Sequence, residues 1–272
     1  MDLHDFKDVA ENYDRYVEAM FSHDRSQEGF LDFYLDLARH HGGGGVVDIA
    51  CGTGAVLLHL AKHGIDVDGT DLSEEMCKVA ARKAERMGLK VRIYQADMTQ
   101  FRSDRKYSLA IIARSGFMHL PTPDLQRAAL LNIREQLTEG GILTLNTFDP
   151  LPFVQAEQMK TTPDDYTFRI EYVNSEGNRE RIYNAITYNP VTQQMYGNWK
   201  FVTYNGNGEV ISERIRPIMM RQTYRQEMKW LAELCGFEVL EIFRDYKGTK
   251  ADESAGGCIW VLRKKDASAK TA

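Results

Sequence analysis

The chain has 272 residues, of which 43% are hydrophobic and 27% are charged, and its formal net charge is -5. This composition is typical of a soluble globular protein with one large domain, or one domain that carries a substantial insertion. The negative charge argues against nucleic acid or an anionic membrane as the main partner, and no apolar run reaches membrane-spanning length.

The four cysteines are scattered and form no CxxC pair, and no histidines stand at ligand-like spacing beside them: Cys51, Cys77, Cys235 and Cys258. We therefore predict reduced thiols, no disulfide framework and no metal site. The first residues lack the basic-then-apolar pattern of a signal peptide, so the expected location is the cytoplasm.

In chain order, residues 5–40 predict two helices with a break near Ser22, and a glycine run at 42–45 leads into the first strand. That strand, Val46 to Ala50, is followed by a Gly-x-Gly turn at Gly52 and Gly54 and by a helical pattern. Glycines allow a ligand to approach the backbone closely, and Thr53 is placed to cap the helix. Strand, tight turn and helix together indicate a nucleotide-binding crossover.

Strands and helices then alternate up to residue 148, with strands predicted at 65–69, 91–94, 109–113 and 142–148. The helices between them begin at Ser73, an N-cap with acids in its first turn, and at Thr122, which precedes a proline at the first helical position. The second of these helices is expected to run to Gly140. Repeated strand-then-helix units predict a doubly wound, Rossmann-like, mostly parallel sheet.

From about residue 165 the period changes to that of an inserted antiparallel β-meander, with strands at 168–172, 181–188, 195–204 and 210–219. Thr223 and Gln226 form a capping box for a further helix, and strands at 239–243 and 258–262 close the fold. The expected division is N-terminal helices at 1–41, a Rossmann-like domain at 42–150 and 221–264, and the β insertion at 151–220.

Acids and turn residues stand at the carboxyl ends of successive strands, where parallel sheets bind ligands: Asp48, Asp71, Asp97 and the Ala113-Arg114 turn. Asp71 is placed to accept hydrogen bonds from ribose hydroxyls. A nicotinamide-binding fold remains an alternative, but it requires a third glycine where this chain has Leu57.

Four motifs occur in this order and spacing: Val47–Gly54, Gly69–Ser73, Ala96–Met98 and Leu137–Gly141. In these motifs, over roughly residues 43–149, the chain resembles the class I S-adenosylmethionine-dependent methyltransferases. The resemblance implies that the glycine turn faces the methionine part of S-adenosylmethionine and that Asp71 holds the ribose. It also implies that Leu72 and Met98 lie beside the adenine and that Asp97 binds its amino group.

The same resemblance assigns the backbone at Ala113 and Arg114 to the methionine amino group and makes Tyr13 a residue that closes over the cofactor. The expected cofactor-binding set is Tyr13, Asp48, Ala50, Gly52, Gly54, Asp71, Leu72, Met76, Asp97, Met98, Ala113 and Arg114. Isolated from the motifs, Leu72 and Met98 would be plain core residues, and Tyr13 a helix-face aromatic.

His119, just past the fourth strand, is the candidate catalytic residue, as an acceptor-orienting group or a base. The alternative is a loop histidine packed under the next helix. The segment is similar to the Gly-His-Leu segment of amino-sugar N-methyltransferases, which also carry a meander before the last helix.

The meander is rich in aromatic residues, which either line an acceptor pocket or pack a core or a dimer interface. Its charged residues Arg169, Glu171, Arg214 and Arg216 are expected on a solvated strand face, with an anionic acceptor as the alternative.

The chain is thus expected to move a methyl group to a nitrogen or oxygen of a small molecule, without a nucleic-acid or membrane partner. Association into a homodimer is a further expectation that the sequence allows. The rivals are an RNA or protein methyltransferase and a non-catalytic S-adenosylmethionine-binding regulatory protein.

Overall fold

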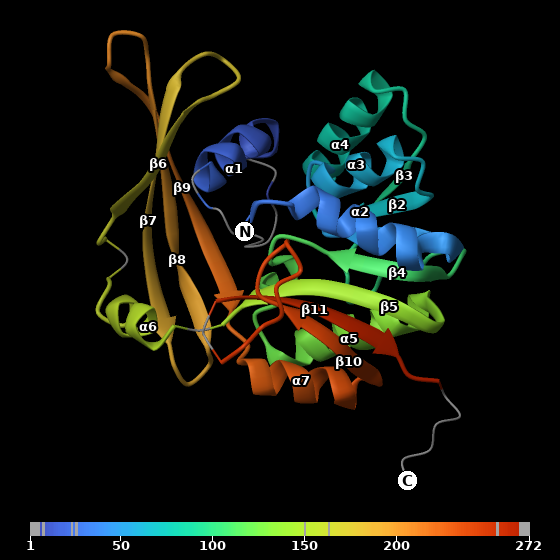
Figure 1. The fold of residues 1–272 in the computed structure, drawn as a ribbon. Coiled ribbons are helices and arrows are strands. Elements are labelled where there is room, and N and C mark those ends of the chain that lie inside the picture. Colours follow the sequence, from blue (N-terminus) through green and yellow to red (C-terminus); the bar gives the residue numbers. More distant parts are fainter. Residues whose placement is uncertain are drawn as a thin grey trace.

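The fold is built on a seven-stranded sheet, in a computed structural model that describes residues 6, 9–22, 24, 27–149, 151–162, 164–253 and 256–266. The strand order is β10-β11-β5-β4-β1-β2-β3 (Figure 1). Strands β1 to β5 run parallel, and β11 lies antiparallel between β5 and β10. The predicted doubly wound, mostly parallel sheet is therefore confirmed. Its strands are β1 (Val46–Ile49), β2 (Val67–Asp71), β3 (Arg92–Gln95), β4 (Tyr107–Ile112), β5 (Leu137–Phe148), β10 (Phe237–Phe243) and β11 (Gly257–Lys264).

Helices cover both faces of this sheet, and the burial of β4 shows why. Leu109 and Ile111 pack into the core under α2 (Phe30–His41) and α3 (Ala55–Lys62), whereas Ala110 and Ile112 pack into the core under α5 (Pro123–Gln136) and α7 (Arg225–Leu234). Side chains alternate between the faces of a strand, so an uninterrupted apolar strand fills two cores.

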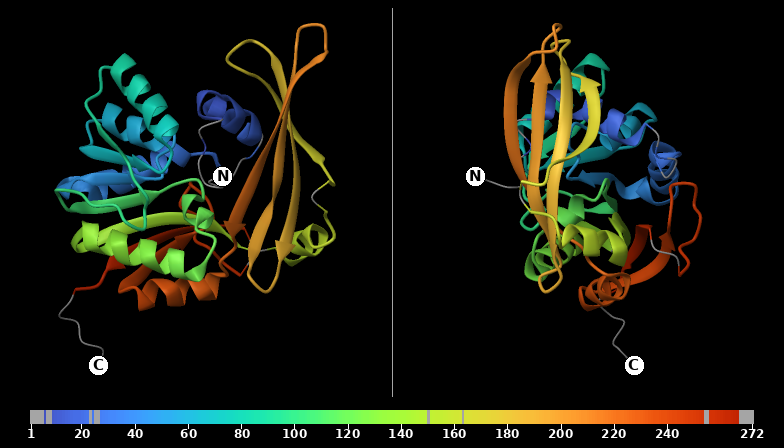
Figure 2. Two further views of the ribbon diagram at one scale, coloured as in Figure 1. Left: turned by 180° about the vertical axis from the view of Figure 1, so that it is seen from behind. Right: turned by 90° about the vertical axis from the view of Figure 1, so that its left-hand side faces the viewer.

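A second sheet stands beside the first and is antiparallel, in the order β6-β7-β8-β9 (Figure 2). Its strands are β6 (Thr167–Val173), β7 (Arg179–Asn189), β8 (Gln194–Tyr204) and β9 (Val210–Arg221), which confirms the predicted meander.

Helix α1 (Tyr13–Phe21) lies between the second sheet and α4 (Glu74–Arg86). A third core joins them, in which Tyr16 of α1 packs with Met76 of α4 and Phe201 of β8. The apolar face of α1 therefore connects the two sheets.

Three local predictions differ from the structure. Helix α5 ends at Gln136 because Leu137 is extended (φ -84°, ψ 146°) and pairs with Tyr107 of β4. The hydroxyl of Thr223 bonds the side chain of Gln126 at 3.2 Å, so the capping box is wrong, and α7 begins at Arg225 without a side-chain cap. A short helix that we did not predict, α6 (Pro152–Gln158), precedes the second sheet.

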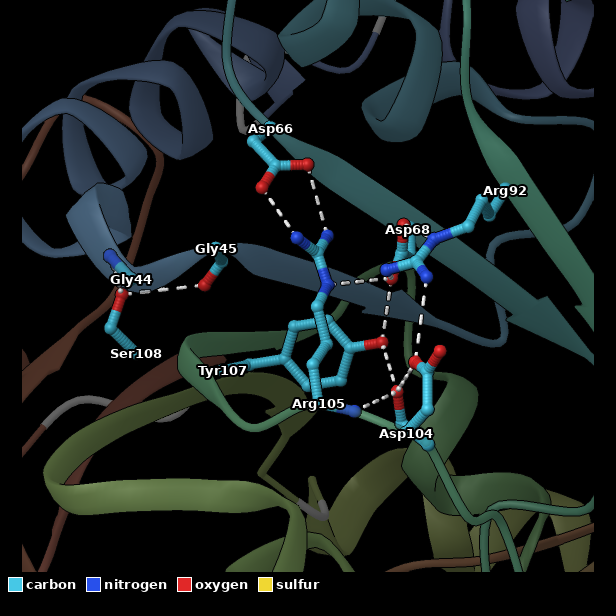
Figure 3. A network of polar contacts seen from close by, with 10 residues as sticks. Gly44, Gly45, Asp66, Asp68, Arg92, Asp104, Arg105, Tyr107 and Ser108 are labelled. Atoms are coloured by element: carbon cyan, nitrogen blue, oxygen red, sulfur yellow. Dashed lines mark hydrogen bonds and ion pairs between the residues drawn. The ribbon is translucent and has the colours of Figure 1, made fainter.

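The amino ends of the parallel strands are closed by an ion-pair network (Figure 3). The buried Oδ2 of Asp68 accepts hydrogen bonds from Tyr107 Oη at 2.7 Å, Arg92 Nη2 at 2.8 Å and Arg105 Nε at 3.0 Å. Burial, together with the hydrogen bond to Asp68, raises the pKa of Tyr107 to about 12. The three cavities described below lie at the opposite rim, at the carboxyl ends of the strands. Within the described part of the chain, every helix is too short or too polar to cross a bilayer.

Candidate functional site

The turn after β1 is held by two carboxylates. Asp48, which is 1% exposed, accepts a hydrogen bond from the Leu57 amide at 3.0 Å and so ties β1 to the first turn of α3. Burial raises the pKa of Asp48 to about 8. Gly52 (φ 56°) and Gly54 (φ 87°) adopt the left-handed backbone that glycine favours.

We predicted that Thr53 caps α3, and this prediction is wrong. Gly54 occupies the N-cap position, and the helix has no side-chain capping hydrogen bond. The Thr53 hydroxyl instead donates to Asp14 Oδ1 of α1 at 2.5 Å. Lys83 of α4 ion-pairs with the same Asp14 and donates to the Thr53 carbonyl at 3.0 Å. These contacts fix α1, and with it Tyr13, over the glycine turn.

Asp71 ends β2 beside this turn. Its Oδ2 accepts from the Gly52 amide at 2.8 Å, and its Oδ1 accepts from the Ser73 amide at 2.9 Å. The carboxylate is therefore fixed in orientation before any ligand arrives.

Asp97 occupies the corresponding place after β3. Its Oδ1 accepts from both the amide and the hydroxyl of Thr99, each at 2.8 Å. Among the described residues, no donor bonds its Oδ2, which leaves one oriented acceptor at this rim.

We call the space between these acids and η4, the single-turn helix Gly116–His119, the strand-end cavity; its volume is about 180 Å³. Ten of the twelve expected cofactor-binding residues line it, and Asp48 and Gly54 line a neighbouring cavity at the glycine turn. The ten are Tyr13, Ala50, Gly52, Asp71, Leu72, Met76, Asp97, Met98, Ala113 and Arg114.

A larger space of about 420 Å³, the intersheet cavity, lies between the carboxyl ends of β4 and β5 and the second sheet. Helix α1 contributes Tyr13 and Tyr16, and the second sheet contributes Trp199 and Arg216. The rings of Tyr16 and Trp199 meet edge to face, with centroids 5.8 Å apart. Its walls are thus aromatic, with a few charged groups.

His119 lines both cavities. It ends η4, and its ring lies edge to face with Phe6 at 5.2 Å. Tyr13 and Arg114 also line both cavities, and burial raises the pKa of Tyr13.

The loop after β4 is strained. Three of the four described non-glycine residues with positive φ belong to this rim: Ala50, Arg114 and Ser115. Asn146 of β5 holds the loop, because its Oδ1 accepts from the Ser115 amide at 2.8 Å. Sequence reasoning missed Asn146, although an amide side chain near the carboxyl end of a predicted strand was a usable signal. Such strain persists where the surroundings fix it, and it concentrates at functional sites.

The expectation for the charged meander residues holds in part. Arg169 and Glu171 are exposed, as on a solvated face. Arg214 instead pairs with the buried Glu180 at 3.0 Å, and Arg216, 9% exposed, stacks on Phe6 with its Cζ 3.7 Å from the ring centre. The sequence pattern of β9 did not show that Arg214 and Arg216 are shielded, because this depends on how β9 pairs within the second sheet and packs against the rest of the fold.

Comparison with known proteins finds a match to the family model described as a methyltransferase domain, over residues 46–141. A protein of Geobacillus sp. (strain WCH70), named only as a methyltransferase, is 26% identical over 87% of this chain and 91% of its own length.

Two further relatives are matched over a smaller part of their length. The ribosomal RNA small subunit methyltransferase C of Alcanivorax borkumensis is 29% identical over 66% of this chain and 54% of its own length. The dTDP-3-amino-3,4,6-trideoxy-alpha-D-glucopyranose N,N-dimethyltransferase of Streptomyces venezuelae is 34% identical over 37% of this chain and 40% of its own length.

Among solved structures, the CcbJ methyltransferase of Streptomyces caelestis has the same fold, with a TM-score of 0.78 at 21% identity. The match covers 98% of this chain and 100% of that one.

Proposed function

We propose that this chain, a class I S-adenosylmethionine-dependent methyltransferase, methylates a nitrogen or oxygen atom of a small molecule held in the intersheet cavity. One observation carries the proposal. The strand-end cavity and the intersheet cavity share His119, Tyr13 and Arg114 as lining residues, so a donor in one and an acceptor in the other would meet at this point.

The residues of the strand-end cavity fit the donor. A side chain at Gly52 would meet only Tyr13 Cε1, at 3.8 Å, so the glycine keeps space open over the turn for the methionine part. Asp71 would accept hydrogen bonds from the ribose hydroxyls, and Oδ2 of Asp97 would accept from the adenine amino group. Leu72 and Met98 would pack beside the adenine ring.

When bound, the sulfonium donor supplies an activated methyl group for a direct displacement. The protein's part is to align the acceptor lone pair with that group and to exclude water. We propose that the aromatic walls of the intersheet cavity hold the acceptor and that residues 1–41 and the insertion at 151–220 cover the site.

His119 would orient the acceptor, or take its proton if the nucleophile must first lose one. An amine that is already neutral needs no base, whereas an ammonium or hydroxyl acceptor does. The same residue therefore serves both acceptor types, in different roles.

A ribosomal RNA acceptor is the second candidate, because one relative carries that activity in its name. Against it stand the net charge of -5 and the position of α1 and the second sheet, which wall in the acceptor side of the cavity. RNA-binding surfaces are usually basic and open.

The test is where a labelled methyl group goes. The protein is incubated with methyl-labelled S-adenosylmethionine and a cell extract, and the small-molecule, RNA and protein fractions are separated. Label in the small-molecule fraction is the expected result, with His119→Ala as the control that reduces it. Label confined to RNA or protein would overturn the proposal, and so would donor binding without transfer to any fraction.

A further inference from the structure

Arg114 occupies an unusual place in the site. It follows β4 with a left-handed backbone (φ 48°), and its side chain lines the strand-end cavity, the intersheet cavity and the cavity at the glycine turn. Tyr13 is the other described residue that lines all three. A group on Arg114 can therefore reach a molecule in any of them.

The Arg114 side chain is partly buried beside two aromatic rings and has no ion-pair partner among the described residues. Its Cζ lies 4.2 Å from the ring centre of Phe30 and 5.0 Å from that of Phe21. Its Nε and Nη1 atoms are buried and have no hydrogen-bond partner, and none of the described carboxylates pairs with it.

Other shielded arginines in the described chain are paired. Arg221 meets Glu227 at 2.5 Å, and Arg225 meets Asp149. The titratable groups near the charge of Arg114 include two tyrosines, Tyr13 and Tyr246. The positive charge lowers the pKa of each tyrosine, but burial raises that pKa by more. Even partial burial of a cation without an anion costs desolvation free energy, so its retention here needs a reason.

We propose that Arg114 binds a carboxylate group of a molecule bound in the site. The rings of Phe21 and Phe30 lie near the guanidinium carbon, so a ligand would bind the N–H groups at the edge of the guanidinium, where each bidentate pair includes Nη2. An edge with two parallel N–H groups matches the planar fork of a carboxylate. The inference rests on the proposed function, because it assigns a residue within the same site.

Two molecules could bring this carboxylate: the donor, through its amino-acid end, or the acceptor, in which case the substrate is a carboxylic acid. The cavities that Arg114 joins allow either source. The test separates them.

Calorimetry compares two ligands, S-adenosylhomocysteine and methylthioadenosine, which lacks the amino-acid part. If the donor brings the carboxylate, Arg114→Gln is expected to lower the affinity for S-adenosylhomocysteine by about tenfold or more. The affinity for methylthioadenosine should then change little. Arg114→Lys should restore part of the loss. Arg244→Gln is the matched control, because Arg244 lines the intersheet cavity but is paired with Asp252 at 3.3 Å.

If both ligands bind Arg114→Gln as they bind the wild type, the acceptor source is tested with acetate. Acetate added to the S-adenosylhomocysteine complex should then shift the NMR signal of the Arg114 Nε–H group, with no shift at Arg244. Equal weakening of both nucleosides in Arg114→Gln, or unchanged affinities together with no response to acetate, would overturn the inference. Neither result would touch the proposed function, which fails if the wild type does not bind the donor, transfers its methyl group to no fraction, or transfers it only to RNA or protein.

Discussion

The Gly52 amide donates a hydrogen bond to Asp71 Oδ2 at 2.8 Å, which joins the turn after β1 to the acid that ends β2. The two residues are 19 positions apart, and each belongs to a different part of the expected donor site. The glycine turn and the acid proposed to bind the ribose thus form one preorganised unit, in which the same carboxylate shapes the loop and lines the strand-end cavity.

We expect Asp71→Asn to weaken the binding of S-adenosylhomocysteine by about 1.5–3 kcal/mol, because an amide replaces a charged hydrogen-bond acceptor. Calorimetry measures the affinity, and thermal unfolding shows whether the loop survives. Asp164→Asn is the control, since Asp164 is exposed on the approach to β6, away from the three cavities. Wild-type affinity in Asp71→Asn would contradict the assignment of the ribose site.

For His119→Ala we expect unchanged donor affinity and a turnover that falls by roughly a hundredfold, if the histidine removes a proton. A fall of only a few fold would indicate an orienting role. His40→Ala is the control, because His40 is an exposed residue of α2 whose ring bonds the carbonyl of Asp36 and lines none of the three cavities. Equal turnover in the two variants would make His119 a packing residue.

Two of the three tryptophans, Trp199 and Trp230, provide a matched pair for testing the proposed acceptor cavity. Trp199 lines the intersheet cavity, whereas Trp230 is 64% exposed on α7. We expect Trp199→Ala to raise the KM of the acceptor by about tenfold through loss of a packed aromatic wall, with donor affinity unchanged. Trp230→Ala should leave both quantities unchanged. If the two variants behave alike, the acceptor does not bind against β8.

The buried Asp48 predicts a pH dependence of stability. Its pKa rises from 3.8 to about 8 on folding. Between pH 3.8 and about pH 8, Asp48 is therefore protonated in the folded state and ionised in the unfolded state. The free energy of unfolding falls as the pH rises through this range. The loss is complete above about pH 8.

Asp48→Asn removes the titrating carboxyl group and keeps a side-chain oxygen that can accept the hydrogen bond from the Leu57 amide. Relative to wild type, the variant should gain stability, on the order of 3 kcal/mol, between about pH 5 and pH 9. Urea unfolding across that range measures the difference. A difference that does not change with pH would show that Asp48 keeps an ordinary pKa.

Sequence reasoning reached the donor side of the site because its signals are local. A buried strand, a glycine turn and an acid at the end of the next strand each follow from period and spacing, and parallel strands bring their carboxyl ends together. Ten of the twelve expected residues line one cavity, although the resemblance to the methyltransferases, and not period or spacing, supplied most of them.

The acceptor side could not be reached in the same way. The intersheet cavity is assembled from α1, the loop after β4 and strands β8 and β9, whose relative placement depends on the packing of two sheets. The role of Thr53 shows the same limit, because its hydroxyl bonds Asp14, 39 positions earlier, and not its own helix. The side chain of Arg114 had no sequence signal, since its lack of a counter-ion is a property of the folded surroundings.

The most direct test of this account is a crystal structure of the protein with S-adenosylhomocysteine. We predict the nucleoside in the strand-end cavity, with its ribose hydroxyls on Asp71, its adenine amino group on Asp97 and its sulfur directed toward His119 and the intersheet cavity. A nucleoside bound elsewhere, or a sulfur directed away from the intersheet cavity, would contradict the proposed arrangement of donor and acceptor.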